Sequence, residues 1–200
     1  MRTSSVLALV AGCALLLTGC DLFGPKEVNY FPLGVGSTWQ YLMLDIRVYP
    51  DSTDTLAQDT ISIEAKAETQ LTSGEKAVLM EVKESGSVDS VYYRTTDDFV
   101  LFYEDLDDDE PDTIIKFPLE PDNIWHLDED ILVRVVGQET KTVVAGTYKN
   151  CWKLRQTEDG ELLLDMWFAP NIGLCLAELD EEYQGIHYIE RLELNSVRIK

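Results

Sequence analysis

The sequence predicts an all-β fold, in which an antiparallel curved sheet forms a half-barrel or a sandwich over residues 30–200. Three observations lead to this prediction. Short apolar segments rich in β-branched and aromatic residues recur along the chain, and several alternate with polar residues. Clusters of turn-forming residues, such as those at 72–74 and 158–160, separate most of these segments. No segment beyond the N-terminal apolar run keeps a long helical period.

Each expected strand is bounded by such turn residues or by a change of polarity. In the first strand, Trp39, Tyr41 and Met43 fall on one side of the pleat, and Ile61 and Ile63 do the same in the second. The expected strands are 39–48, 60–67, 77–82, 90–93, 99–103, 114–117, 131–136, 142–144, 148–154, 162–168, 174–179 and 186–199. The one helical turn that we expect lies at 121–124.

One sequence motif occurs twice. FPLGVGSTW (31–39) and FPLEPDNIW (117–125) share Phe-Pro-Leu, then five residues, then Trp, and each copy precedes an apolar or alternating run. The proline would end the preceding strand, the middle of the motif would turn, and Phe, Leu and Trp would fix the corner to the core. We therefore expect two corners at related places in a sheet of two similar halves; the alternative is a chance match.

The N-terminus reads as a secretory signal. Arg2 gives it a positive start, and the apolar run at 6–17 is too short to span a membrane. Leu17-Thr18-Gly19-Cys20 resembles the bacterial lipobox. That resemblance implies cleavage before Cys20 and lipidation of its thiol by a diacylglycerol, which anchors the protein in a membrane of the bacterial cell envelope. Residues 1–19 are then the signal peptide and 20–29 a lipidated tether; an ordinary signal peptide cleaved elsewhere is the alternative.

The charge of the chain limits its partners. It carries 37 acidic residues against 16 Lys and Arg, a formal net charge of −21. Cleavage before Cys20 would remove Arg2 and no acidic residue. Such a chain is repelled by nucleic acid and by anionic lipid alike. We therefore expect no nucleic-acid partner, and membrane attachment through the lipid on Cys20 alone.

The cysteines fall into two groups. Cys13 lies in the signal and Cys20 at the lipobox, so Cys151 and Cys175 remain in the expected domain. Two cysteines in an exported domain favour a disulfide, with two separate buried thiols as the alternative. No Cys-x-x-Cys and no Cys/His spacing typical of zinc or redox sites occurs.

The densest acidic run offers a weak metal candidate. Asp105, Asp107 and Asp109 have the alternate spacing of a calcium-binding loop. Glu110 occupies the position where that loop needs glycine, and Lys116 the position where it needs glutamate, so the EF-hand interpretation fails. A looser calcium site and a solvated hairpin end remain as alternatives, and we predict no metal as a cofactor.

Catalytic motifs find no support in the sequence. No Gly-x-Ser-x-Gly, His-Glu-x-x-His or phosphate-binding glycine loop occurs, and no cofactor is indicated. The two histidines are His126, which has Asp128 and Glu129 nearby in sequence, and His187. No serine or cysteine is placed by sequence context to be activated by either. We therefore predict that the protein is not an enzyme.

Several motifs together resemble a known group of proteins. The Phe-Pro-Leu corner at 117–125, the segment VAGTYKNC at 144–151 and the segment WFAPNIGL at 167–174 resemble uncharacterised bacterial lipoproteins. The Trp-Phe-Ala-Pro turn is also similar to a hairpin in the half-open barrels of lipoprotein-carrier and lipoprotein-receptor proteins. Those proteins hold acyl chains in an apolar hollow, so the resemblance implies a similar hollow here.

The function that we expect is non-catalytic binding or structural work on a bacterial membrane, with an apolar ligand held in the curved sheet. Two alternatives belong to other classes. A protein-interaction module would dock an envelope partner through a sheet edge or loops. A hydrolase with an unrecognised site is the third interpretation.

Overall fold

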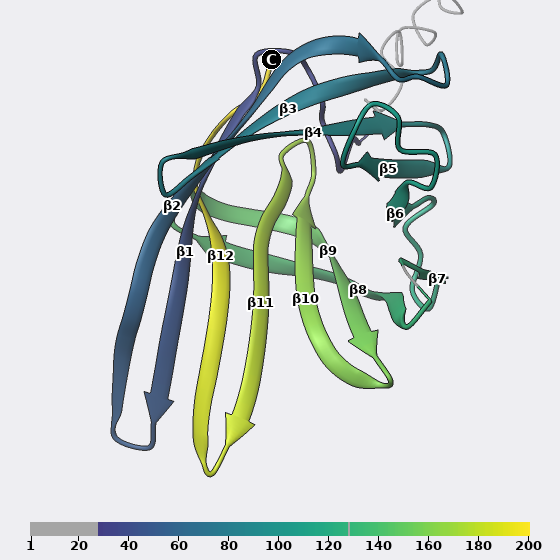
Figure 1. The fold of residues 1–200 in the computed structure, drawn as a ribbon. Helices are drawn as coiled ribbons and strands as arrows, with labels where there is room; N and C mark the ends of the chain where they lie inside the picture. Colours follow the sequence, from purple (N-terminus) through teal and green to yellow (C-terminus); the bar gives the residue numbers. More distant parts are fainter. Residues whose placement is uncertain (1–27, 128) are drawn as a thin grey trace, which may run out of the picture.

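The computed structural model describes residues 28–127 and 129–200, which form one antiparallel sheet (Figure 1). The predicted signal peptide, Cys20, nearly all of the predicted tether and Asp128 lie outside the described residues. The strands are β1 (Thr38–Tyr49), β2 (Ser52–Gln70), β3 (Lys76–Glu84), β4 (Ser87–Thr95), β5 (Phe99–Tyr103), β6 (Asp112–Lys116), β7 (Ile124–His126), β8 (Ile131–Val143), β9 (Gly146–Glu158), β10 (Glu161–Ala169), β11 (Gly173–Tyr183) and β12 (Ile186–Arg198). No helix long and apolar enough to span a membrane occurs in this part of the chain.

The strand order follows the chain in two runs. The sheet reads β6-β5-β4-β3-β2-β1-β12-β11-β10-β9-β8-β7, so β1 and β12 pair in its middle and β6 and β7 form its two ends. The sheet curves until these ends approach one another, and Figure 1 shows β5, β6 and β7 stacked along one side. The prediction of an all-β antiparallel curved sheet is confirmed.

Three element predictions need correction. The segments expected at 131–136 and 142–144 are one strand, β8, whose pairing with β9 shifts at Val135/Gly137 and at Glu139/Lys141. The stretch expected to hold a helical turn contains a turn at 121–122 and then the short strand β7. Strand β2 begins at Ser52, well before the expected 60, because residues 52–57 pair with β1 while both faces stay exposed to solvent.

The two Phe-Pro-Leu motifs form equivalent corners, as predicted. In the first, Ser37 N–H donates to Gly34 O (2.9 Å); in the second, Asn123 N–H donates to Glu120 O (3.1 Å). Gly36 and Asp122 occupy the matching position of each turn, with φ of 87° and 68°. The turn then pairs with a buried residue of the next strand, through Gly36 N–H to Ala65 O (2.7 Å) and Asp122 N–H to Val135 O (2.9 Å).

The tryptophan of each motif joins the two halves of the sheet. Trp39 Nε1–H donates to Ile172 O (2.7 Å), and Trp125 Nε1–H donates to Thr113 O (2.7 Å). Both indoles are buried, and in each case the accepting carbonyl belongs to the other half of the chain. The bond to Thr113 crosses between β7 and β6, where the two ends of the sheet approach each other. The motif therefore fixes how the sheet closes on itself.

A long hairpin folds over part of the sheet. The outer parts of β8 and β9 extend beyond β10. In Figure 1 they pass behind β10, β11 and β12 and cover the rear face of these strands. At the hairpin end, Ala145 N–H donates to Leu194 O (2.9 Å) and Val144 N–H donates to Glu193 Oε1 (2.8 Å). The space between the hairpin and the sheet holds buried Val143, Trp167 and two cysteines. This hairpin makes the structure locally two layers thick.

Candidate functional site

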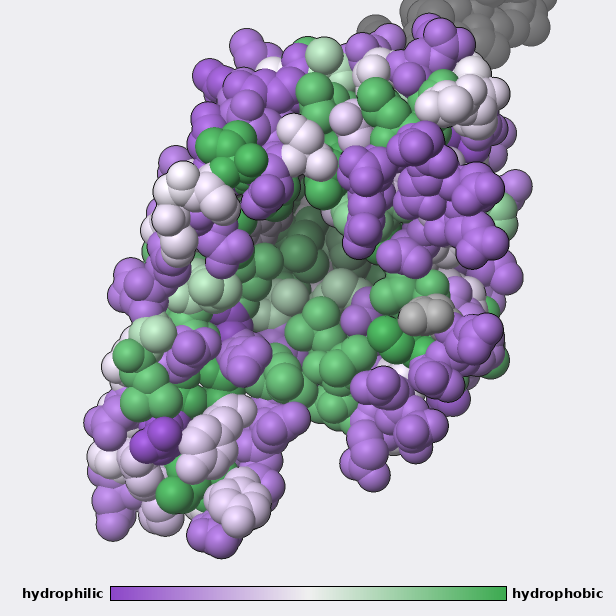
Figure 2. Space-filling view, in the orientation of Figure 1, coloured by the Kyte–Doolittle hydropathy of each residue, from purple (hydrophilic) through white to green (hydrophobic). Residues whose placement is uncertain are grey.

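The first corner contains an open apolar pocket of about 90 Å³. The side chains that line it include Phe31, Trp39, Tyr41, Met80, Tyr93 and Leu174. They come from the corner itself and from strands in both halves of the sheet. Figure 2 shows that hydrophobic side chains line the hollow of the curved sheet, while hydrophilic residues cover most of the rim. The hollow suits an apolar group that enters from solvent.

The second corner is the internal counterpart of this pocket: its buried side chains fill the matching place, while Phe117, Pro118 and Leu119 border a separate hollow of about 690 Å³ that also contacts Asp97 and Asp98. In the first half, Ala65 pairs with Met80 on the next strand, and Met80 pairs with Val91 on the strand after that. In the second half, Val135 pairs with Leu154 and Leu154 with Met166 in the same way. Met80 therefore matches Leu154, and Val91 matches Met166. Tyr93 lies two residues after Val91, and Phe168 lies two residues after Met166, so Tyr93 matches Phe168. Leu119, Trp125, Val133, Leu154 and Phe168 of the second corner are buried, whereas Phe117 and Leu127, the counterparts of Phe31 and Tyr41, are half-buried.

The first corner differs by two phenol groups. The counterparts of Tyr41 and Tyr93 are Leu127 and Phe168, so hydroxyls stand where the second corner has hydrocarbon. The Tyr41 hydroxyl donates to Leu174 O (3.0 Å), and burial raises its pKa. The half-buried Tyr93 ring packs on Phe31 and Phe102, with centroids 5.1 Å and 5.4 Å away. Burial raises the pKa of Tyr93 to about 12.

Tyr93 also stands between two depressions. A second hollow of about 280 Å³ shares Phe31, Leu33 and Tyr93 with the pocket and continues to Lys76 and Arg94. The Tyr93 hydroxyl has no hydrogen-bond partner among the described residues. An apolar group in the pocket and a polar group in the second hollow would therefore meet at this side chain.

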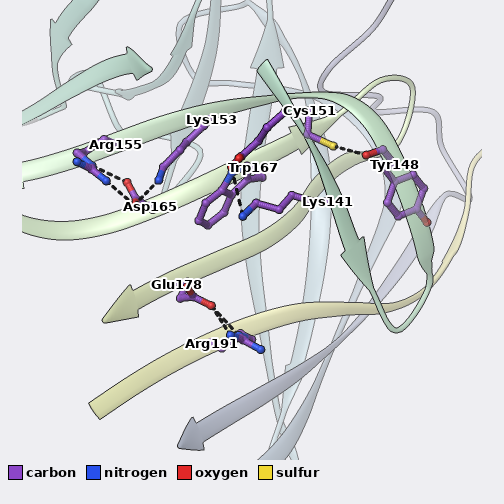
Figure 3. A network of polar contacts seen from close by, with 10 residues as sticks. Lys141, Tyr148, Cys151, Lys153, Arg155, Asp165, Trp167, Glu178 and Arg191 are labelled. Carbon is purple, nitrogen blue, oxygen red and sulfur yellow. Dashed lines mark hydrogen bonds and ion pairs between the residues drawn. The ribbon is translucent and has the colours of Figure 1, made fainter. Parts of the chain in front are cut away.

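The two cysteines lie together beneath the β8–β9 hairpin. Cys151 on β9 and Cys175 on β11 are both fully buried and free in this structure. The two thiols are within hydrogen-bonding reach of each other, and Cys151 also lies 3.4 Å from Tyr148 O (Figure 3). The contact with Cys151, together with burial, raises the pKa of Cys175.

We expect these thiols to form a disulfide when the chain is exposed to an oxidising compartment. The bond would close a loop and so lower the conformational entropy of the unfolded chain. For a loop of this size the effect stabilises the fold by about 3 kcal/mol. Iodoacetamide should therefore label neither thiol in the denatured protein unless a reductant is added first, and reduction should lower the midpoint of urea unfolding. A Cys151→Ser variant, which cannot form the bond, should show no reductant effect. Full labelling without reductant would contradict this prediction.

A charged network lies next to the cysteines (Figure 3). Arg155 donates to both oxygens of buried Asp165 (2.8 Å each), and Lys153 contacts the same carboxylate at 2.7 Å. Burial alone would raise the Asp165 pKa, but the hydrogen bonds from Arg155 and Lys153 outweigh it and hold the pKa below its usual range. Trp167 lies between the ammonium groups of Lys141 and Lys153, at 3.8 Å and 4.7 Å from its ring centre. Every charge here has a partner, so the network is structural.

The structure does not gather the acidic run into a metal site. Asp105, Asp107 and Asp109 are exposed, and the described residues hold no group of three or more ligands suited to a metal ion. The loop is organised by Asp108, whose carboxylate accepts hydrogen bonds from the backbone N–H groups of Glu104 (3.3 Å) and Glu110 (3.1 Å).

The histidines lie on separate strands. His126 is exposed on β7. His187 is at the exposed end of the β11–β12 hairpin, where Nδ1 lies 2.9 Å from Asp180 Oδ1 and Nε2 lies 3.9 Å from Glu182 Oε2. The hydrogen bond to Asp180 raises the His187 pKa. The carboxylates orient a ring that faces solvent on a projecting hairpin.

Sequence reasoning did not single out the pocket. It placed Trp39 and Tyr41 on the expected strand 39–48 and included Tyr93 in the expected strand 90–93, without connecting them, because each half of the chain is equally apolar. The one sequence signal for the pocket was the doubled motif, because aligning its two copies allows the residues of the two corners to be compared. Comparison of the chain with protein-family models, with curated proteins and with solved structures finds no match.

Proposed function

We propose that this protein is a lipid-anchored component of the bacterial cell envelope that binds an apolar ligand in its curved sheet without catalysing a reaction. The observation that carries the proposal is the contrast between the two corners. A filled core would bury more apolar surface and be more stable, as the buried cluster of Val133, Leu154 and Phe168 in the second corner illustrates. An open apolar pocket at the equivalent place is a cost in stability that binding explains.

The size of the pocket limits what enters it. A cavity of about 150 Å³ holds a benzene molecule. The pocket of about 90 Å³ is smaller, so it accommodates the end of a hydrocarbon chain, with the remainder of the ligand in the open hollow. The lipobox-like segment at 17–20 supports the proposed attachment to a membrane, because a chain anchored by lipid lies beside a supply of acyl compounds.

The interaction-module alternative has less support. Such a module would use a long bare edge strand. The sheet ends at β6 and β7, which have 5 and 3 residues. A partner strand would find few backbone groups to pair with at these two ends; the longer bare edge is residues 52–60 of β2, which pair with β1 alone.

The test is a native mass spectrum of the full chain, purified from cell envelopes, before and after extraction with organic solvent. We expect a mass excess that extraction removes, in addition to covalent diacylglycerol on Cys20. Ile63→Phe, which adds bulk to the pocket wall, should lose the excess, and Val88→Phe on an exposed hairpin should keep it. The same bare mass for the wild type and both variants would overturn the proposal.

A further inference from the structure

A four-stranded projection extends from the curved sheet. Strand β3 pairs with β2 only from Ile61 onward, and β10 pairs with β11 only up to Glu178. Residues 43–60 and 179–191 therefore continue beyond the rest of the sheet as two paired hairpins, in the order β2-β1-β12-β11 (Figure 1). In this projection, residues 52–60 of β2 pair with β1 on one side and with no described strand on the other. Such an edge presents a row of unpaired backbone N–H and C=O groups to solvent.

The edge at 52–60 has little of the usual protection. Edge strands in soluble proteins are commonly short, or carry lysine, proline or a β-bulge. This segment contains no lysine and no proline, and its pairing with β1 shifts once, near Leu56, which is 52% exposed. Residues 136–143 of β8 are also unpaired on one side, but they include Lys141 and lie where the pairing with β9 shifts twice. The β2 edge is therefore the better place for an added strand.

On one face of this edge, an exposed carboxylate stands without an ion pair. The register places Asp54 of β2 opposite Arg47 of β1. The Arg47 guanidinium lies over the Tyr188 ring, 5.1 Å from its centre, and donates to the Tyr49 hydroxyl (3.2 Å) instead of forming an ion pair with Asp54. A basic side chain of a partner could therefore meet the Asp54 carboxylate at the edge.

The other face of the edge continues into an apolar strip. Thr53 and Thr55 pair with Val48 and Ile46 of β1, whose side chains are half-buried. Ile189 of β12 pairs with Ile46 and extends the strip. A strand added beside β2 would lengthen this face, and apolar side chains on it would cover the strip further. Because successive side chains of a strand point to opposite faces, the edge suits a segment in which basic and apolar residues alternate.

Charge decides between the possible occupants of this edge. The projection carries eight acidic residues against two arginines, and the whole chain has a formal net charge of −21. Two copies of the chain therefore repel each other, which disfavours pairing of β2 with the same strand of a second copy. A basic segment is attracted to the same surface, because complementary charge speeds and orients association.

We propose that residues 52–60 of β2 bind an extended basic segment of a partner protein, which adds to the sheet as a further strand. Backbone hydrogen bonds hold the segment, its basic side chains lie on the face of Asp54, and its apolar side chains lie on the face of Ile46. The proposal goes beyond the proposed function and does not depend on it, because none of the residues that line the apolar pocket belongs to this edge.

The experiment uses the full chain in nanodiscs of phosphatidylcholine, a lipid without net charge. The probe is a short peptide of alternating lysine and valine with blocked ends. A control peptide of the same sequence is N-methylated at two adjacent central residues, so that it keeps the charge but interrupts hydrogen bonding along both of its edges. Fluorescence anisotropy of labelled peptides gives the affinities, and hydrogen exchange of the protein amides locates the binding.

We expect the probe to slow exchange in residues 52–60. The control peptide should bind about tenfold more weakly or worse, because several backbone hydrogen bonds are lost. Asp54→Asn should weaken binding of the probe about two- to fivefold, the value of one exposed ion pair. Glu181→Gln removes an equal charge from the same row of the projection but on β11, its far strand, and should weaken binding less.

Three results would overturn the proposal. Equal binding of the two peptides would mean that charge alone attracts them. Equal losses for Asp54→Asn and Glu181→Gln would place the peptide away from the edge. Slow exchange of residues 52–60 without peptide, lost when the protein is diluted, would mean that a second copy occupies the edge.

Discussion

Replacing Asp165 with alanine lowers the free energy of unfolding by about 2–4 kcal/mol. The substitution leaves Arg155 and largely buried Lys153 without the carboxylate that they share. Removing one partner of a buried ion pair typically costs about 3–5 kcal/mol, because an uncompensated charge stays inside the fold. The value here is smaller because the Arg155 side chain is 42% exposed and water screens it. Urea unfolding at neutral pH measures the loss.

The Asp165 carboxylate also makes the free energy of unfolding depend on pH. The Asp165 pKa is lower in the folded state than in the unfolded chain, so the folded state holds this proton more weakly. Its contribution is complete above the unfolded value of about 3.9 and is lost as pH falls through the folded pKa. Asp165→Asn should therefore be less stable at neutral pH and lose less stability on acidification. Parallel pH profiles for wild type and Asp165→Asn would show that the pair contributes nothing.

Replacing Leu154 with alanine lowers the free energy of unfolding by about 2–5 kcal/mol. Leu154 is fully buried in the filled corner, between Val135 and Met166 on the neighbouring strands. Truncation leaves a cavity that the closely packed neighbours cannot fill. Met80→Ala is the matched variant in the first corner. It should cost less, because the space that it leaves joins an open pocket that water can enter.

Chemical denaturation of the two variants side by side tests the contrast on which the proposed function rests. An equal or larger loss for Met80→Ala would mean that the first corner is packed as tightly as the second. The free energies of unfolding would then give no indication of an open pocket in the first corner.

Much of the fold could be predicted from the sequence, because most strands bury one face. The buried positions of β3, β5 and β10 follow the expected apolar runs, and the doubled motif predicted the two corners correctly. The errors concern segments without that signal. Residues 52–57 of β2 are exposed on both faces, so no alternation marks them. The middle of β8 is polar where its pairing shifts, which divided one strand into two predicted ones.

The candidate site was less accessible to such reasoning. Its identity depends on register, since only the pairing of β3 with β4 and of β9 with β10 reveals that Tyr93 and Phe168 are counterparts. The closeness of Cys151 and Cys175 likewise depends on the β8–β9 hairpin crossing β10, which local sequence does not encode. The prediction of lipidation at Cys20 concerns residues outside the described part of the chain.

The pairing of β1 with β12 sets an order of events for a growing chain. Synthesis starts at the N-terminus, so β1 is complete long before its neighbour β12 exists. Until then the edge of β1 that β12 will cover presents unpaired backbone groups to any other extended chain. The last contacts made are also the longest in sequence, down to Lys200 N–H on Ser37 Oγ (2.9 Å), which makes folding slow. A molecule assembled in this order is most vulnerable to aggregation just before its final strand pairs.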